Sequence, residues 1–114
     1  MPIPEPIARH SYSASGLNLA TTAGTLPRIG YRAAAGGLLF VDTLTGGATY
    51  TITWYVAFTP GGTLVPAADT SGNALTTTVT AGKAYEIPGA LYGAEEISPV
   101  LNNGTGTARA SLKS

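Results

Sequence analysis

The chain has 114 residues and no cysteine, and its six basic side chains equal its six acidic ones in number. This length corresponds to one domain, and the lack of cysteine excludes disulfides, thiolate metal sites and cysteine nucleophiles. Charged residues make up only 11% of the chain, too few for the clustered Lys and Arg that neutralise nucleic-acid phosphates. A surface with so little charge favours association with a second copy or with a large partner.

The first six residues contain three prolines, which fix φ and disfavour helix in the residues before them. We therefore expect an extended arm over residues 1–10 and a single domain over residues 11–114. The arm either frays or lies along a neighbouring subunit. In the second case its candidate partner-binding residues are Pro2, Ile3, Pro4, Pro6 and Ile7. We expect no signal peptide and no membrane-spanning segment, because the required apolar runs are missing.

Small polar residues dominate the next part of the chain. Residues 11–30 predict one or two short strands that break at Gly16. A further short strand is predicted from Arg28 to Ala33, with Ile29 and Tyr31 on the same face. Both of these side chains are therefore expected to face the core.

Two apolar segments follow, and they differ in pattern. Leu38–Val41 is a compact apolar run of the type found in fully buried strands. Thr49–Thr59 alternates strictly, which is the signature of a half-buried strand. Its large apolar residues of one parity are Tyr50, Ile52, Trp54, Val56 and Phe58. We expect Trp54 in the core, whereas Tyr55 has the opposite parity and is the best candidate for an exposed or partner-binding aromatic.

The rest of the chain alternates short strands with turns. Strands are predicted over residues 63–65, 74–80, 83–87, 97–101 and 105–112, with turns at 60–62, 69–73, 81–82 and 102–104. Residues 88–93 predict a single helical turn that closes one end of the core. About eight short strands at a spacing of about 8–12 residues predict an all-β fold, either an antiparallel β-sandwich or a jelly-roll-like barrel.

Residues able to carry chemistry are few and scattered. His10 is the only histidine and stands beside the proline-rich start, and the six carboxylates form no recognisable pair. Asp69–Asn73 resembles a calcium loop but lacks its second acid and its distant Glu, so a tight turn is favoured. Ala81–Ala84 lacks the upstream glycine and the Ser or Thr of a phosphate loop. We therefore predict no enzymatic activity, no catalytic, metal-binding or cofactor-binding residues, and no cofactor.

An ordered series of short motifs runs through the C-terminal half. It comprises Trp54-Tyr55-Val56, Pro60-Gly61-Gly62, Leu64-Val65-Pro66, Asp69, Gly72-Asn73-Ala74-Leu75, Val79, Ala81-Gly82-Lys83-Ala84-Tyr85, Ile87-Pro88, Ala90-Leu91-Tyr92-Gly93-Ala94 and Ala110-Ser111-Leu112-Lys113-Ser114. In this series the chain resembles small β-sandwich structural proteins of tailed bacteriophages, often called cement, decoration or accessory proteins. The first half of the chain has no such counterpart.

The resemblance implies a non-enzymatic virion structural protein, in particular a capsid cement or decoration protein that binds and stabilises the assembled shell. It implies two partners: the phage major capsid protein or another virion protein, and the chain itself as a homo-oligomer, with a trimer preferred. Synthesis in the host cytoplasm and a final location on the capsid surface follow from this role. Neither nucleic acid nor membrane is expected as a partner.

A carbohydrate-binding β-sandwich module is the alternative function. Its stacking residues would be Tyr55, Tyr85 and Tyr92, because sugar-binding modules expose rows of aromatic side chains. A hydrolase is a more distant third interpretation.

Overall fold

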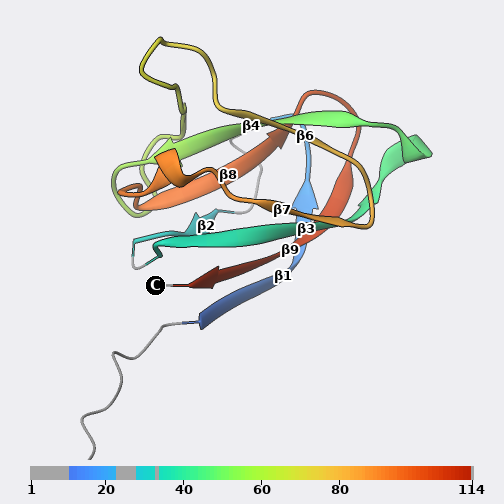
Figure 1. Ribbon diagram of the computed structural model, residues 1–114, viewed down its shortest axis with the longest axis horizontal. Helices are drawn as coiled ribbons and strands as arrows, with labels where there is room; N and C mark the ends of the chain where they lie inside the picture. Colours follow the sequence, from blue (N-terminus) through green and yellow to red (C-terminus); the bar gives the residue numbers. More distant parts are fainter. Residues whose placement is uncertain (1–10, 23–27, 33, 114) are drawn as a thin grey trace, which may run out of the picture.

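The alternating segments of the sequence form two antiparallel sheets that pack face to face in the computed structural model (Figure 1). The structure describes residues 11–22, 28–32 and 34–113. Within these residues the structure confirms the predicted all-β sandwich, which contains nine strands and two short 3₁₀ turns. The arm residues 1–10 lie outside the described residues.

Each sheet combines strands from distant parts of the chain. The first sheet has the order β1 (Ser11–Leu19), β9 (Gly106–Lys113), β3 (Gly36–Leu44), β7 (Lys83–Glu86). The second has the order β2 (Ile29–Gly30), β8 (Glu96–Leu101), β4 (Tyr50–Ala57), β5 (Val65–Pro66), and β6 (Thr76–Val79) pairs with the same edge of β4 as β5. The 3₁₀ turns are η2 (Thr45–Gly47) and η3 (Gly89–Leu91).

The strand pairings are nested like those of one long hairpin. β1 pairs with β9, β2 with β8, β3 with β7 and β4 with β6, all antiparallel, and β5 lies close to the tip of this hairpin. Successive pairs alternate between the two sheets, and the contacts β3–β9 and β4–β8 complete each sheet. A long hairpin rolled up in this way is a jelly roll, the double-sheet form that buries one face of every strand.

The core lies between the inward faces of the sheets. In β4 the side chains of Ile52 and Trp54 are fully buried and Val56 nearly so, as the alternation predicts. The first sheet contributes alternate residues in the same way, including Leu39 and Val41 of β3. Burial of large aliphatic and aromatic side chains is worth roughly 1.5–3 kcal/mol each, so this layer supplies most of the stabilisation.

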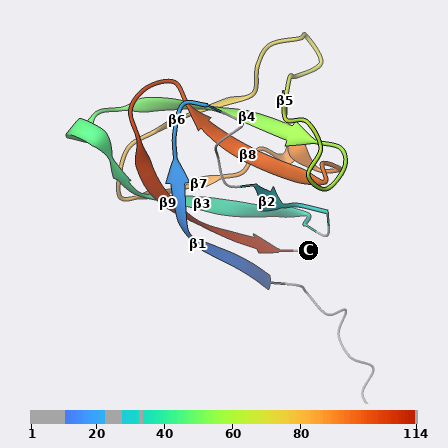
Figure 2. The same cartoon turned by 180° about the vertical axis from the view of Figure 1, so that it is seen from behind.

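The region around η3 confirms a further prediction. η3 follows β7 closely and its Leu91 is buried, so the predicted single helical turn does close one end of the core. Ile29 and Tyr31 are also both buried, as their shared parity predicts. Figure 2 shows the same molecule from behind, with β2 at this end of the sandwich.

Two expectations about apolar residues are wrong. Phe58 shares the parity of the β4 core residues, but its side chain is 76% exposed because the strand ends at Ala57 and the chain turns away. Leu38 lies in a run expected to be buried on both faces, yet it is 50% exposed because it points to the outer face of the first sheet. That face has no second layer over it within the described part of the chain.

Gly16 does not end a strand, contrary to the prediction. It has a φ of +69° and lies where the register between β1 and β9 shifts, between Ala14 and Leu17. A shift of this kind is a β-bulge, and glycine accommodates its left-handed backbone without strain. β1 therefore continues as one bent strand.

Candidate functional site

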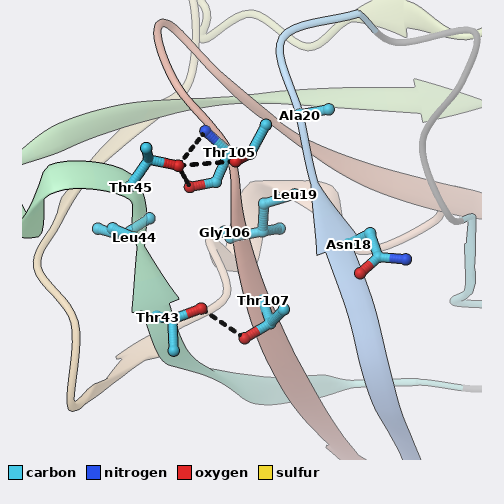
Figure 3. A pocket seen from close by; sticks show the side chains of 9 residues that line it. All are labelled: Asn18, Leu19, Ala20, Thr43, Leu44, Thr45, Thr105, Gly106 and Thr107. Carbon is cyan, nitrogen blue, oxygen red and sulfur yellow. Dashed lines mark hydrogen bonds between the residues drawn. The ribbon is translucent and has the colours of Figure 1, made fainter.

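Among the described residues, two hollows at opposite ends of the sandwich are considered as sites. The first, which we call the threonine cleft, is lined by Asn18, Leu19, Ala20, Thr43, Leu44, Thr45, Thr105, Gly106 and Thr107 (Figure 3). The second, which we call the apolar groove, is lined by Val56, Phe58, Val65, Pro66, Ala67, Ala68, Leu75, Ala90, Leu91, Tyr92, Gly93 and Ala94. Their volumes are about 490 and 340 Å³ respectively.

The hydroxyl groups of the threonine cleft bind one another. The Oγ1 atoms of Thr43 and Thr107 are 2.8 Å apart, and those of Thr45 and Thr105 are 2.7 Å apart (Figure 3). The Thr45 hydroxyl also donates to the Thr105 carbonyl oxygen at 2.8 Å and accepts the Thr105 N–H at 3.0 Å. These bonds join the end of β3 to the start of β9, so the threonines of the cleft are best explained as a structural contact that holds the two strands together.

The apolar groove differs from the threonine cleft, because its described lining residues are apolar or aromatic and include no threonine or asparagine. Among the described side chains, four large apolar ones are exposed: Leu38, Phe58, Val65 and Tyr92. All except Leu38 line this groove. Exposed apolar side chains are common singly, but a cluster of them in a concave surface marks a binding site.

A partly buried ion pair between Arg28 and Glu96 lies beside the wall of the groove that carries Phe58. Glu96 Oε1 accepts the Gly61 N–H at 2.8 Å and a guanidinium N–H of Arg28 at 3.1 Å. Arg28 also donates to the Gly62 carbonyl oxygen. Gly61 has a φ of +69°, and Gly62 N–H bonds back to Thr59 O at 2.9 Å. These bonds anchor the turn that follows Phe58 to Arg28 and Glu96.

This arrangement also perturbs the ionisation of Glu96. The Gly61 N–H bond lowers the pKa of the Glu96 carboxyl, partial burial opposes it, and the Arg28 guanidinium lowers it further. The net effect holds the pKa below the ordinary 4.5. Glu96 is thus ionised over the whole neutral range, and it acts as a hydrogen-bond acceptor for the turn.

The opposite wall of the groove is η3 and the residues after it. Leu91 N–H bonds to Pro88 O at 3.0 Å and Ala94 N–H to Leu91 O at 3.0 Å, so Leu91 is held inside the core. Gly93 has a φ of +100°, which lets the chain reverse immediately after Tyr92. As a result the Tyr92 side chain is left 73% exposed at the groove.

The candidate residues predicted from sequence do not line the apolar groove, except for Tyr92, or lie outside the described residues. Tyr55 is half-buried on the outward face of β4, where it lies opposite Ser98 of β8 and Pro66 of β5, and it is not part of the groove lining. Pro2, Ile3, Pro4, Pro6 and Ile7, like His10, lie outside the described residues. The three tyrosines of the carbohydrate alternative are carried by separate elements, and the hydroxyl of Tyr85 is hydrogen-bonded to Thr80.

The groove residues Phe58 and Val65 were not among the sequence candidates. The signal that was available is the Pro60-Gly61-Gly62 turn, which begins two residues after Phe58. A residue beyond the end of a strand no longer has to follow the alternation of that strand. The turn interpretation of Asp69–Asn73 is confirmed, since Asp69 Oδ1 accepts the N–H groups of Ser71 and Asn73, both at 2.9 Å. The described residues contain no group of three or more acidic or histidine side chains that would hold a metal ion.

Comparison with known proteins finds no match: neither a protein-family model, nor a curated protein, nor a solved structure corresponds to this chain. The resemblance to phage structural proteins therefore stays a prediction. In the part of the chain that the structure describes, no helix has the length and apolar character needed to cross a membrane.

Proposed function

We propose that this protein is a non-enzymatic structural component of a phage virion, a cement or decoration protein that binds the capsid surface and stabilises the assembled shell. The observation that carries the proposal is the apolar groove, a concave surface without charged lining residues in the described chain, which exposes Phe58, Val65 and Tyr92. Surfaces of this kind, with aromatic anchors in a preformed hollow, are typical of protein docking.

Three further features support a role in assembly. The jelly-roll topology is used by viral capsid domains, although it is also used by lectins, so the fold alone is an analogy. The low charge of the chain favours attachment by shape and apolar contact. The motif series that begins at Trp54 resembles phage accessory proteins, which supplies the virion as the setting.

The proposed partners are the major capsid protein, or another virion protein, and further copies of the chain, with a trimer preferred. Several weak groove contacts would act together in an oligomer, because the second and third contacts are intramolecular once the first has formed. The arm residues Pro2, Ile3, Pro4, Pro6 and Ile7, and Tyr55 on β4, remain candidate contacts. Synthesis in the host cytoplasm followed by binding to the capsid surface completes the proposed role.

The test is co-purification with particles. Gradient-purified particles from a lysate whose phage encodes the chain should contain it in a fixed ratio to the major capsid protein. Particles stripped of the protein should lose heat resistance and regain it when the wild-type chain, or the Leu38→Ser control, is added. Phe58→Ser should restore much less, because it removes an aromatic anchor from the groove. A chain that never sediments with particles contradicts the proposal, and a monomer that binds glycans would favour the carbohydrate-binding module.

A further inference from the structure

The apolar groove exposes aromatic side chains on both of its walls. Phe58 and Tyr92 stand on its two walls with about three quarters of each side chain exposed, and Pro66 lines the same hollow. Its described lining residues include no charged side chain. A matching occupant is therefore apolar and narrow, and it needs no charged groups to orient it.

Grooves lined by aromatic side chains are a common receptor for polyproline-type segments. Such segments are extended before binding, so they lose little entropy, and their pyrrolidine rings pack flat against aromatic faces. A preformed groove and a stiff ligand both reduce the entropy lost on association.

The chain contains a segment of this composition. Residues 1–7 read Met-Pro-Ile-Pro-Glu-Pro-Ile, with a single charged side chain, Glu5. The described chain begins at Ser11, which pairs with Lys113 at the same end of the sandwich where β7 leads to η3. Figure 2 shows β1 beginning at the end of the sandwich that carries β5.

We infer that residues 1–7 of one copy fill the apolar groove of a second copy. Within one copy the arm starts from β1, one edge of the first sheet, whereas the groove is built from the second sheet and from η3, which follows β7 at the opposite edge. The spacing of β1 and β7 alone is three strands, roughly 14 Å at about 4.8 Å each. Residues 8–10 span only roughly 9 Å at about 3.1 Å per residue. A chain that reached its own groove would have to use Pro6 and Ile7 as linker, whereas a neighbouring copy offers its groove to the whole segment.

This inference rests on the part of the proposed function that makes the groove a protein-docking site, and it does not require a virion. Sedimentation equilibrium on the full chain tests it first. The wild type and Leu38→Ser, which alters an exposed apolar residue on the outer face of the first sheet and outside the groove lining, should self-associate equally. Phe58→Ser, Tyr92→Ser and a deletion of residues 2–7 should each weaken self-association at least about tenfold. Circular dichroism should show that all of these variants keep the native fold.

A mixing experiment then identifies the occupant. Phe58→Ser has an intact arm and a damaged groove, and the deletion variant has an intact groove and no arm. Each should be monomeric alone, and the two mixed should form a one-to-one complex. A synthetic peptide of residues 1–10 should compete with this complex, whereas the same peptide with Pro2, Pro4 and Pro6 changed to glycine should compete much less.

The outcomes separate this inference from the proposed function. A full chain that stays monomeric at high concentration, or a mixture that does not associate, overturns the inference. If these variants fail to alter self-association but Phe58→Ser still loses particle binding, the groove binds a capsid protein instead. If self-association follows the arm and groove but no variant affects particle binding, the inference stands and the proposed docking of the groove on the shell is wrong.

Discussion

Trp54 allows the packing argument to be tested quantitatively. Its side chain is fully buried in β4, an interior strand of the second sheet. Large-to-small substitution at such a site removes the buried surface and leaves a cavity, so Trp54→Ala should lower the free energy of unfolding by about 3–5 kcal/mol. Since a domain of this size is stable by only about 5–15 kcal/mol in total, the variant should be close to unfolding.

A second substitution separates the polar part of this contribution. Trp54 Nε1–H donates to Thr77 Oγ1 of β6 at 3.0 Å. Thr77→Val removes the acceptor and leaves a buried N–H unpaired, which should cost about 1–3 kcal/mol. In a Trp54→Phe background there is no indole N–H to be left unpaired, so Thr77→Val should lower the free energy of unfolding by less than about 0.5 kcal/mol. The difference between the two backgrounds measures the hydrogen bond.

Urea unfolding followed by circular dichroism gives these free energies, since the signal does not depend on the tryptophan. The emission maximum of the native protein should be blue-shifted relative to that of the unfolded chain, because Trp54 is the only tryptophan and is buried. A water-like emission maximum, or equal costs of Thr77→Val in both backgrounds, would refute the reasoning.

Three other predictions concern single positions. The free energy of unfolding should fall as the pH drops below about 4.5, because the pKa of Glu96 is lowered in the folded state and protonation removes the stabilisation that its carboxylate provides. The Glu96→Gln variant should show a flatter pH profile in acid unfolding curves. Gly37→Ala should cost about 1–3 kcal/mol in thermal unfolding, because its Cβ would lie 2.5 Å from a β9 carbonyl oxygen. The control Gly36→Ala should be nearly neutral, because in the described part of the chain its Cβ would meet no atom within 4 Å. Ser98→Ala should be neutral or stabilising by up to about 1 kcal/mol, since the Ser98 hydroxyl is buried and has no hydrogen-bond partner among the described residues. A clear loss of stability would show that it has one.

Period-two alternation carried most of the fold prediction, and the two misplaced side chains have different causes. Ile52 and Trp54 were placed correctly because a strand paired on both sides must keep its parity. Phe58 was misplaced because the ladder ends at Ala57, and parity has no meaning beyond the last paired residue. Leu38 was misplaced because a run of apolar residues does not reveal whether a second layer covers the outer face.

The apolar groove was not predictable from local patterns, because its parts meet only through long-range pairing. Phe58 follows β4, Val65 belongs to β5, and Tyr92 follows η3. These residues become neighbours because β4 pairs with both β5 and β8, and because η3 connects β7 of one sheet to β8 of the other. The η3 turn itself was predicted, but its role as a groove wall depends on the topology.

The nested topology also restricts the form of any oligomer built from the arm and the groove. Because the β1 start and the groove lie at the same end of the sandwich, two copies that face each other end to end can exchange arms reciprocally, which gives an isologous dimer. A one-way contact from each copy to the next is heterologous, and it closes only if the rotation per contact divides a full turn, as it does for a trimer. The resemblance to phage accessory proteins favours three copies, so we expect a sedimentation mass three times that of the chain.

In the mixing experiment a ring cannot close, because the only productive pair is one armed copy and one intact groove. The mixed complex should therefore stop at two chains and dissociate more readily than the wild-type oligomer. A wild-type mass of two chains would point to reciprocal exchange, and masses that grow continuously with concentration would show that the heterologous contact does not close.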